Sequence, residues 1–514
     1  MKNSGDSQRS RRNGAWREGI PVWSGLALLV TLAAAWCFHN GYILYYGDAL
    51  CHLNASRSII DSLTPGYEQI GTPWLPMLHI ICLLFVTNDW LWSTGLAGTI
   101  PVAICFTIAG TAFYFAAKSA YGNSAAAMVV AACFALNPNV LYLASIPMTE
   151  VVFLAGLAVL LFALLRFRET QRIAYFALGV ASSWAMSLTR FDAWFLIPFT
   201  ALAFGWFAKR KQVVVLIGSG ALAGLVPLYW MAHSWWQSGN ALDFYNGPYS
   251  AAAIQGPHSY PGYHDWPVAV LFYAKAGQLC AGWCLVLLGL AGCLIAAKKQ
   301  TGRVPILFLC LTPAFYVWAV HSSKVPIYVP QLYFGSYYNL RYGIAVVAFS
   351  AFAAGAVVLA IPEKWRRFGF AIPLLAAAAW LVPPSKDNWV CWKESQVNSE
   401  ARRAWTKAGA DFYETNYRPG ERILTSSGDV MGIMSQAGIP LRETLSVNNG
   451  VTWLATTTRP DLLHRELWVV AQQGDLLWQA LSRQRIPIYQ IVKTIRVKGA
   501  PPLVIYRKTA ERSQ

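Results

Sequence analysis

The chain contains the run MTEVVFLAGLAVLLFALL at residues 148–165, in which one charged residue, Glu150, stands near the start. A helix rises about 1.5 Å per residue, so a run of this length comes close to crossing a hydrocarbon core of about 30 Å. Ten other apolar runs lie near residues 21–38, 92–116, 125–144, 173–189, 193–208, 213–232, 267–296, 304–321, 340–361 and 368–383. The sequence therefore predicts an α-helical polytopic membrane protein with about eleven transmembrane helices.

The composition favours the same class. Of the 514 residues, 56% are hydrophobic and 13% are charged, whereas soluble globular proteins contain about 25% charged residues. The formal net charge of +17 is compatible with nucleic acid binding, but the basic residues lie mainly in short loops between apolar runs, which is the pattern of membrane topology. No nucleic acid partner is predicted. Most of the ten cysteines lie inside apolar runs, so neither a disulfide framework nor a metal site is predicted.

Charge asymmetry sets the predicted topology. The basic residues 1–20 precede an apolar run without a cleavage site, so we expect an uncleaved first span with the N-terminus in the cytoplasm. The apolar piece Leu75–Val86 is too short to span and is expected to lie along the membrane surface. The predicted inner segments then hold 18 Lys and Arg residues, whereas the outer loops hold Arg57, Arg190, Lys324 and Arg341. This distribution predicts a multi-pass protein of the cytoplasmic (inner) membrane with an extracytoplasmic C-terminal part.

Two domains are predicted. Residues 1–383 form the membrane domain, whose first outer loop is 39–91, and residues 384–514 form a small extracytoplasmic α/β domain in which 30 of 131 residues are charged. In the second domain we expect helices at 402–413, 430–436 and 476–483, and strands at 422–426, 466–471, 488–497 and 503–507. The domain has no glycine-rich phosphate loop, metal-ligand spacing or nucleophile elbow, so a structural and an acceptor-binding role both fit it.

The first outer loop contains the leading candidate residue. The stretch GDALCHLNASR at residues 47–57 places Asp48 just outside the first span, and His52 and Arg57 follow it on a predicted helix, Ala49–Ser62. An ionisable residue at a membrane boundary is costly without a partner or a task. Asp48 can act as a general base toward an acceptor hydroxyl or as the N-cap of that helix, and the two roles are compatible.

Two further outer turns carry charge. Glu150 lies in a tight turn before its span, where it is either a second acid of a site or an interfacial acid bonded to water. Arg190 and Asp192 flank a phenylalanine in another turn, and an internal ion pair is the simplest interpretation of that turn.

A late outer loop supplies basic residues. His321 and Lys324 follow one span, and Arg341 with Tyr342 begins the next. A guanidinium at the level of the lipid head groups offers a planar fork for phosphate oxygens, and a lysine adds a point charge. Anchoring to anionic lipid heads is an alternative role for the same residues.

At these positions the chain resembles the GT-C class of polytopic glycosyltransferases that use polyprenyl-phosphate sugars. It is most similar to the bacterial branch related to protein mannosyltransferases and lipid A aminoarabinose transferases (glycosyltransferase families 39 and 83). The shared features are the soluble tail, the proline-rich stretch 71–76, and the positions of Asp48, Arg57, Glu150 and Arg341-Tyr342. The resemblance implies a GT-C fold.

The resemblance also implies roles for single residues. Asp48 would be the catalytic base or its direct organiser, Glu150 would be the second catalytic acid of the site, and Arg57 and Arg341 would bind the donor phosphate. From their positions in the sequence we also expect Lys324 to share in phosphate binding. The residues expected to line the site are His52, Arg190, Asp192, His321 and Tyr342. The chain departs from the family at Ala49, where many relatives have a second acid, and at Thr72, where aminoarabinose transferases have a lysine. No cofactor is assigned. A divalent metal is compatible with two converging acids, but their spacing does not indicate one.

The implied function is transfer of a hexose or pentose, with inversion, from a polyprenyl-phosphate donor to a lipid, glycan or protein acceptor at the outer face of the inner membrane. Membrane lipids and the lipid-linked donor are the expected partners, and the acceptor is not identified. A transporter or flippase of a lipid-linked glycan is the main alternative, although the ionisable residues crowd the outer boundary and no internal repeat is evident. An anchored binding module and an O-antigen ligase or polymerase are weaker alternatives.

Overall fold

The structure is a computed structural model that describes residues 3–381, 388–426, 428–458, 466–483 and 488–509. By its internal contacts the chain divides into two compact units. The first, called the helical unit here, contains the chain up to His39 together with Ile100–Glu394. The second, called the sheet unit, contains Asn40–Thr99 and the chain from Ser395 onward. The first predicted outer loop thus groups with the C-terminal part, and the division at 383/384, which falls outside the described residues, stays a prediction.

Every apolar run of the sequence contains a helix of the helical unit. The larger helices are α1 (Asn3–His39), α5 (Leu96–Tyr121), α6 (Ser124–Ala135), α7 (Pro138–Ala144), α8 (Thr149–Thr170), α9 (Ile173–Ser187), α10 (Asp192–Phe207), α11 (Gln212–Ser238), α14 (Trp266–Ala281), α15 (Trp283–Lys299), α16 (Arg303–Ser322), α17 (Ile344–Ala354) and α18 (Ala371–Leu381). The short 3-10 turn η2 (Leu340–Gly343) leads into α17, and η3 (Gly355–Ala360) and η4 (Glu363–Phe370) follow it.

Six helical segments among the described residues are long and apolar enough to cross a membrane, and eight are if each of two bent pairs counts as one span. One bent pair is α6 with α7, at 67°, and the other is α14 with α15, at 106°. The helices α9 and α10 are apolar but have only 15 and 16 residues. The expected count of eleven includes these two and α18 as spans, so it stays a prediction beyond the eight.

The run 267–296 is wrong as a single straight helix. It breaks at Gly282, whose φ is +77°, a left-handed conformation that L side chains rarely adopt. A Cβ atom there would also lie 2.9 Å from the Trp380 ring. An apolar run shows where a chain is buried, but it does not show a bend, because a bend depends on one backbone conformation.

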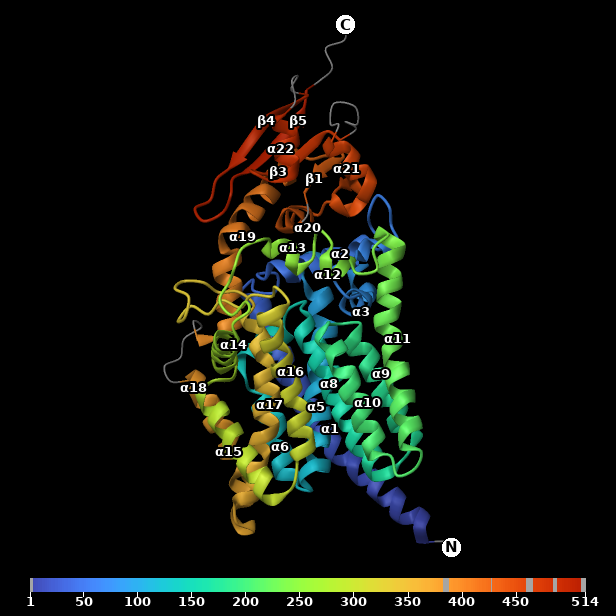
Figure 1. Cartoon of the computed structure of the whole chain (residues 1–514). Coiled ribbons are helices and arrows are strands. Elements are labelled where there is room, and N and C mark those ends of the chain that lie inside the picture. The colour runs from blue at the N-terminus through green and yellow to red at the C-terminus, as the bar shows by residue number, and fades with distance from the viewer. Residues whose placement is uncertain (1–2, 382–387, 427, 459–465, 484–487, 510–514) are drawn as a thin grey trace. The chain divides into compact units, whose positions relative to one another are not determined.

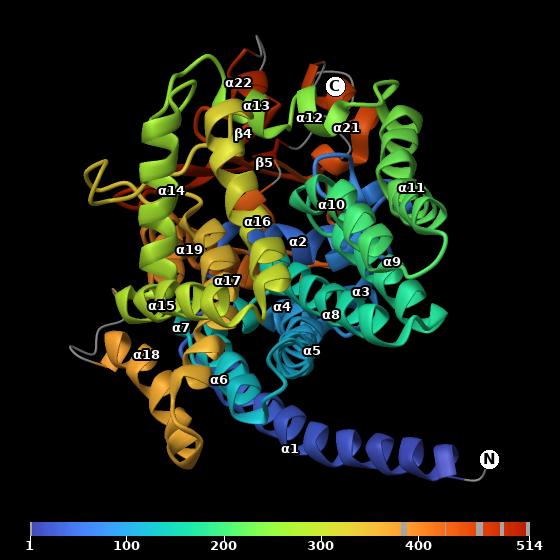
Figure 2. The same ribbon diagram turned by 60° about the horizontal axis from the view of Figure 1, so that its bottom comes forward.

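The helices of this unit form two neighbouring groups. One contains α8, α9, α10 and α11, and the other contains α14, α15, α16 and α17 (Figures 1 and 2). Contacts between α10 and α16 join the groups. Small residues allow close approach within each group, since a Cβ at Gly156 would meet Met186 across the α8–α9 contact, and a Cβ at Gly292 would meet the Ala353 carbonyl across the α15–α17 contact.

The sheet unit is built on a five-stranded sheet with the order β2-β1-β3-β5-β4. β1 (Ile423–Thr425) pairs in parallel with β2 (Thr444–Leu445) and β3 (Trp468–Gln472), whereas β5 (Leu503–Lys508) pairs antiparallel with β3 and with β4 (Tyr489–Ile495). The helices are α2 (Gly47–Ser58), α3 (Met77–Val86), α4 (Asp89–Thr94), most of α19 (Val390–Asn416), α20 (Gly432–Gln436), α21 (Gly450–Thr458) and α22 (Leu476–Ser482). All the elements predicted after residue 400 are confirmed; β2 and α21 were not predicted.

Two expectations concern helices of the predicted first outer loop, and the structure corrects one and confirms the other. The helix predicted at Ala49–Ser62 is α2, which begins at Gly47, and its N-cap residue is Tyr46, not Asp48. The short helix expected within Leu75–Val86 is present as α3. Since Asp48 stands in the first turn of α2, it is near the positive end of the helix dipole without being its cap.

Candidate functional site

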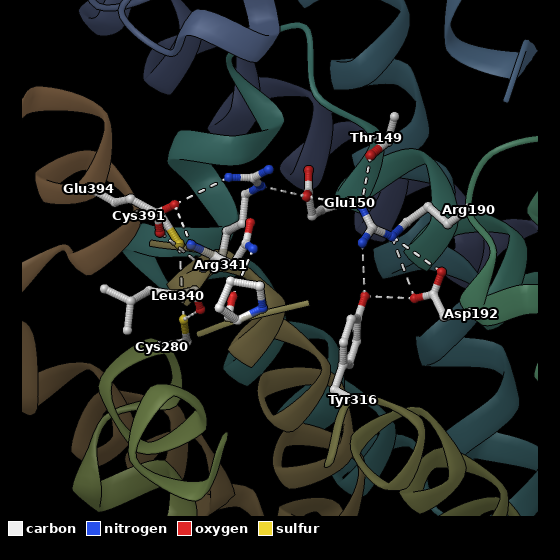
Figure 3. Close-up of polar contacts among 12 residues, drawn as sticks. Thr149, Glu150, Arg190, Asp192, Cys280, Tyr316, Leu340, Arg341, Cys391 and Glu394 are labelled. Atoms are coloured by element: carbon white, nitrogen blue, oxygen red, sulfur yellow. Dashed lines mark hydrogen bonds and ion pairs between the residues drawn. The ribbon is translucent and has the colours of Figure 1, made fainter. Parts of the chain in front are cut away.

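A cluster of buried charged residues lies where several elements of the helical unit begin. It consists of Glu150 on α8, Arg190 and Asp192 at the start of α10, Arg341 on η2 and Glu394 on α19 (Figure 3). We call these five residues the charged cluster. Turns at helix ends concentrate here, and such turns allow short polar side chains and long guanidinium groups to meet while the helices themselves remain apolar.

Glu150 joins the two arginines of the cluster. Its Oε1 atom accepts hydrogen bonds from Arg190 Nη1 at 3.0 Å and from Arg341 Nε at 3.1 Å. The side chain is 3% exposed, and its second oxygen, Oε2, is buried without a hydrogen-bond partner among the described residues. A buried acceptor left unused is unfavourable by about 1–3 kcal/mol. A ligand group that donates a hydrogen bond to Oε2 would therefore be stabilised at this position.

Arg190 is held by oxygen atoms of four residues. Besides Glu150, the guanidinium donates to Thr149 Oγ1 at 2.8 Å and to the Tyr316 hydroxyl at 3.0 Å, and its Nε lies 3.3 Å from Asp192 Oδ1. The Tyr316 hydroxyl in turn donates to Asp192 Oδ2 at 2.7 Å. Burial alone would lower the pKa of Arg190, but Tyr316, Asp192 and Glu150 outweigh it and raise that pKa well above its usual value. The internal ion pair expected in this turn is present.

Tyr342 connects the two arginines by its ring. The guanidinium carbons of Arg190 and Arg341 lie 4.9 Å and 5.2 Å from the centre of this ring. The ring stacks on Tyr316 at 5.0 Å, and Tyr316 stacks on Tyr273 at 5.7 Å. Such stacks give the guanidinium groups a rigid and weakly hydrated wall.

The charged cluster contains more acid than base. When all groups are ionised, three carboxylates (Glu150, Asp192, Glu394) face two guanidiniums, which gives a formal charge of −1. Five predicted site residues meet here: Glu150, Arg190, Asp192, Arg341 and Tyr342. Sequence reasoning missed Glu394 and Tyr316. Glu394 could have been noticed in the sequence as an acid within an aromatic stretch just after the last apolar run. Tyr316 could not be distinguished from an ordinary tyrosine at a membrane interface.

Two other predicted residues of the helical unit have different surroundings. Lys324 Nζ donates at 3.5 Å to the carbonyl oxygen of Gly256. The His321 ring stacks on Trp266 at 3.9 Å, and its Nδ1 lies 2.6 Å from Ser322 Oγ. His321 and Ser322 belong to the last turn of α16 and Trp266 to the first turn of α14. None of these contacts is with the charged cluster.

Asp48 belongs to the sheet unit, where a second group of charges surrounds it. Burial raises the pKa of the neighbouring Cys51 thiol, and the carboxylates of Asp429 and Asp48 raise it further, which places both acids close to this thiol. Asp429 accepts from Arg402 Nη1 at 2.8 Å and from Arg403 Nη2 at 3.2 Å. Arg402 and Arg403, the partners of Asp429, are residues of α19 that the sequence did not single out.

Arg57 is committed to neighbours within the sheet unit. Its Nε lies 2.8 Å from Asp61 Oδ2, its Nη2 lies 2.7 Å from Asp89 Oδ1, and its Nη1 donates to the Val86 carbonyl. The guanidinium also lies over the Trp92 ring, and the side chain is 8% exposed. This geometry clamps α2, α3 and α4 together, and it leaves little of the guanidinium for a phosphate.

His52 packs against aromatic and imidazole rings. Its Nδ1 lies 3.0 Å from His79 Nε2, and its ring centre lies 4.1 Å from that of Trp74. Complete burial lowers the pKa of His79 to about 4, so this histidine is neutral at physiological pH. Among the described residues, no group of three or more His, Cys, Asp or Glu side chains is arranged to hold a metal ion.

Comparison with known proteins identifies the fold. No family model matches the chain, and no curated protein matches it. The structure is similar to the crystal structure of ArnT from Cupriavidus metallidurans in the apo state, with a TM-score of 0.58. The alignment covers 94% of this chain and 98% of that one.

The chain has a GT-C fold. This confirms the fold class predicted from the sequence, since ArnT is an aminoarabinose transferase of that class. The two chains share 12% of their residues, so the likeness concerns the fold alone. The comparison assigns no role to the charged cluster or to Asp48.

Proposed function

We propose that this GT-C protein is a membrane glycosyltransferase that moves a sugar from a polyprenyl-phosphate donor to an acceptor hydroxyl or amine. Its fold supports the proposal, because the likeness to ArnT extends over nearly the whole of both chains. The observation that carries it is the pair of guanidiniums, Arg190 and Arg341, fixed on either side of one buried carboxylate. In the proposed topology the N-terminus is cytoplasmic, and the sheet unit and the site are extracytoplasmic.

In the proposed reaction the acceptor attacks the anomeric carbon with inversion. The bond from that carbon to the phosphate oxygen breaks, a bond to the acceptor atom forms, and the acceptor proton passes to the Asp48 carboxylate. The leaving polyprenyl phosphate gains negative charge, so cations placed before the reaction stabilise the transition state more than the ground state. Arg341 has this role, and the geometry adds Arg190 as a second cation. Arg57 is left out, because its own unit already occupies its guanidinium.

Glu150 is proposed as the second acid of the site. A phosphate beside a cluster with a formal charge of −1 needs compensation, and Glu150 can supply it by yielding its place between the arginines. Its buried Oε2 then offers a hydrogen-bonding position to a sugar or acceptor hydroxyl.

A transporter or flippase of a lipid-linked glycan is the second candidate. The observation that favours it is the pair of bent helices, because transporters use broken helices at their substrate sites. In this chain, however, the buried charges of the charged cluster lie at helix ends. That position fits a site at one membrane face better than a path through the bilayer.

The test is sugar transfer by purified protein in liposomes that contain a panel of radiolabelled polyprenyl-phosphate sugars. We expect the wild-type protein to release or transfer the label. Asp48→Asn should lower that rate at least 100-fold, because a general base contributes about 10²–10⁴-fold. Arg341→Ala should weaken donor binding. Asp411→Asn and Arg172→Ala are controls, because both side chains are exposed. Movement of the intact lipid between leaflets without cleavage by any variant would instead support the transporter.

A further inference from the structure

The carboxylate of Glu394 is bonded to the chain segment that carries Arg341. Its Oε1 accepts from the backbone N–H of Asn339 at 2.9 Å and from Arg341 Nη1 at 3.2 Å. Its Oε2 accepts from the backbone N–H of Arg341 at 3.3 Å. The Glu394 side chain is 1% exposed. Figure 3 shows it directed toward Arg341. One buried carboxylate therefore binds both the backbone and the side chain of the same arginine.

The backbone at this point needs such a partner. Asn339 is the N-cap of η2 and has a left-handed φ of 55°, and its side chain is used elsewhere, donating to the Pro326 carbonyl at 2.9 Å. The first N–H groups of any helical turn lack partners within the turn. Glu394 supplies an acceptor to two of them, so it fixes the start of η2 and the direction in which Arg341 leaves the backbone.

The position of Glu394 is itself secured by a closed set of hydrogen bonds. At the start of α19, the Cys391 N–H donates to Asn139 Oδ1 at 3.0 Å. Asn139 Nδ2 donates to the Cys280 carbonyl at 3.1 Å, and Cys280 Sγ lies 3.1 Å from the Leu340 carbonyl oxygen of η2. Residues of α7, α14, α19 and η2 thus hold one another in place, and all of them belong to the helical unit.

We infer that Glu394 is a positioning residue for Arg341, and this inference rests on the function proposed above. Glu394 touches no reacting atom. It holds the guanidinium with Nε toward Glu150 and Nη1 toward α19, so that the cation is oriented before the donor phosphate arrives. Orientation in advance is what makes a charge effective in a transition state, because no reorganisation is then needed during the reaction.

The test is a double-mutant cycle in the full-length protein, with Glu394→Gln, Arg341→Ala and the double variant. If Glu394 acts through Arg341, Glu394→Gln raises the donor KM about tenfold in the wild-type background, as expected for the loss of a charge-assisted hydrogen bond. The same substitution has no further effect on the donor KM when residue 341 has already been changed from arginine to alanine. Glu394→Asp, which keeps the charge, should recover part of the affinity. Glu414→Gln, an exposed acid on the same helix, is the matched control.

A purely structural role predicts different numbers. In that case the factors of the two single variants multiply in the double variant, and Glu394→Asp is no better than Glu394→Gln; either result would overturn the inference. If wild type transfers no sugar from any donor, the proposed function fails, and the cycle is then scored on thermal unfolding. Additive shifts in that measurement also overturn the inference, whereas non-additive shifts show that Glu394 holds Arg341 whatever the reaction is.

Discussion

Replacing Glu150 with glutamine tests whether the charged cluster is held together by its central carboxylate. The variant keeps the shape of the side chain and one oxygen acceptor, but it removes the charge that Arg190 and Arg341 share at 3.0 Å and 3.1 Å. Removing one partner of a buried ion pair costs about 3–5 kcal/mol. We expect the lower end, about 3 kcal/mol, because Arg190 retains Asp192, Arg341 retains Glu394, and no net positive charge is left buried.

The measurement is thermal unfolding in one detergent at one scan rate, followed by tryptophan fluorescence, since unfolding of such a protein is expected to be irreversible. For a chain of 514 residues, a loss of about 3 kcal/mol should lower the transition temperature by about 3 °C. The matched control is Glu169→Gln on the same helix. Glu169 also pairs with an arginine, Arg166, but its side chain is 39% exposed, so its loss should cost less than about 1 kcal/mol. If the two variants melt together, the central carboxylate does not stabilise the cluster, and the reasoning is refuted.

Two further predictions concern the sheet unit. Arg57→Lys should destabilise that unit by about 2 kcal/mol, because one ammonium cannot replace a planar guanidinium that binds Asp61 and Asp89 at once. Limited proteolysis of this variant should be faster than that of the control Arg418→Lys. Equal rates would contradict the role of Arg57 in holding α2, α3 and α4 together. His79 should make stability depend on pH. Its pKa is about 4 in the folded chain and about 6.5 when unfolded, so the unfolded state binds more protons between these values and stability falls as pH drops from about 6.5 toward 4, by up to about 3 kcal/mol. The melting temperature should change less with pH in His79→Gln than in wild type over this range. Equal pH dependence in the two proteins would exclude His79 as the source of the effect.

The turns that carry Glu150, Arg190 and Arg341 show how much of the site local sequence can predict. Glu150, Arg190 and Arg341 could be selected because each is a charge beside a long apolar run, and such a charge is costly without a partner. Their meeting could not be predicted, since Glu150 is 40 positions from Arg190 and 191 from Arg341. Glu394, 53 positions beyond Arg341, was missed because nothing in its neighbours indicates a partner that far away.

The sequence by itself determined the membrane class, a helix at every apolar run and the main strands of the C-terminal sheet. These properties depend on composition and on periods of a few residues, which a single stretch of chain contains in full. The tertiary structure decided the bend at Gly282, the grouping of Asn40–Thr99 with the C-terminal residues, the commitment of Arg57 to two aspartates and the assembly of the charged cluster. Each of these depends on which distant segments become neighbours, because a buried charge takes as partners the groups that packing places within hydrogen-bond distance.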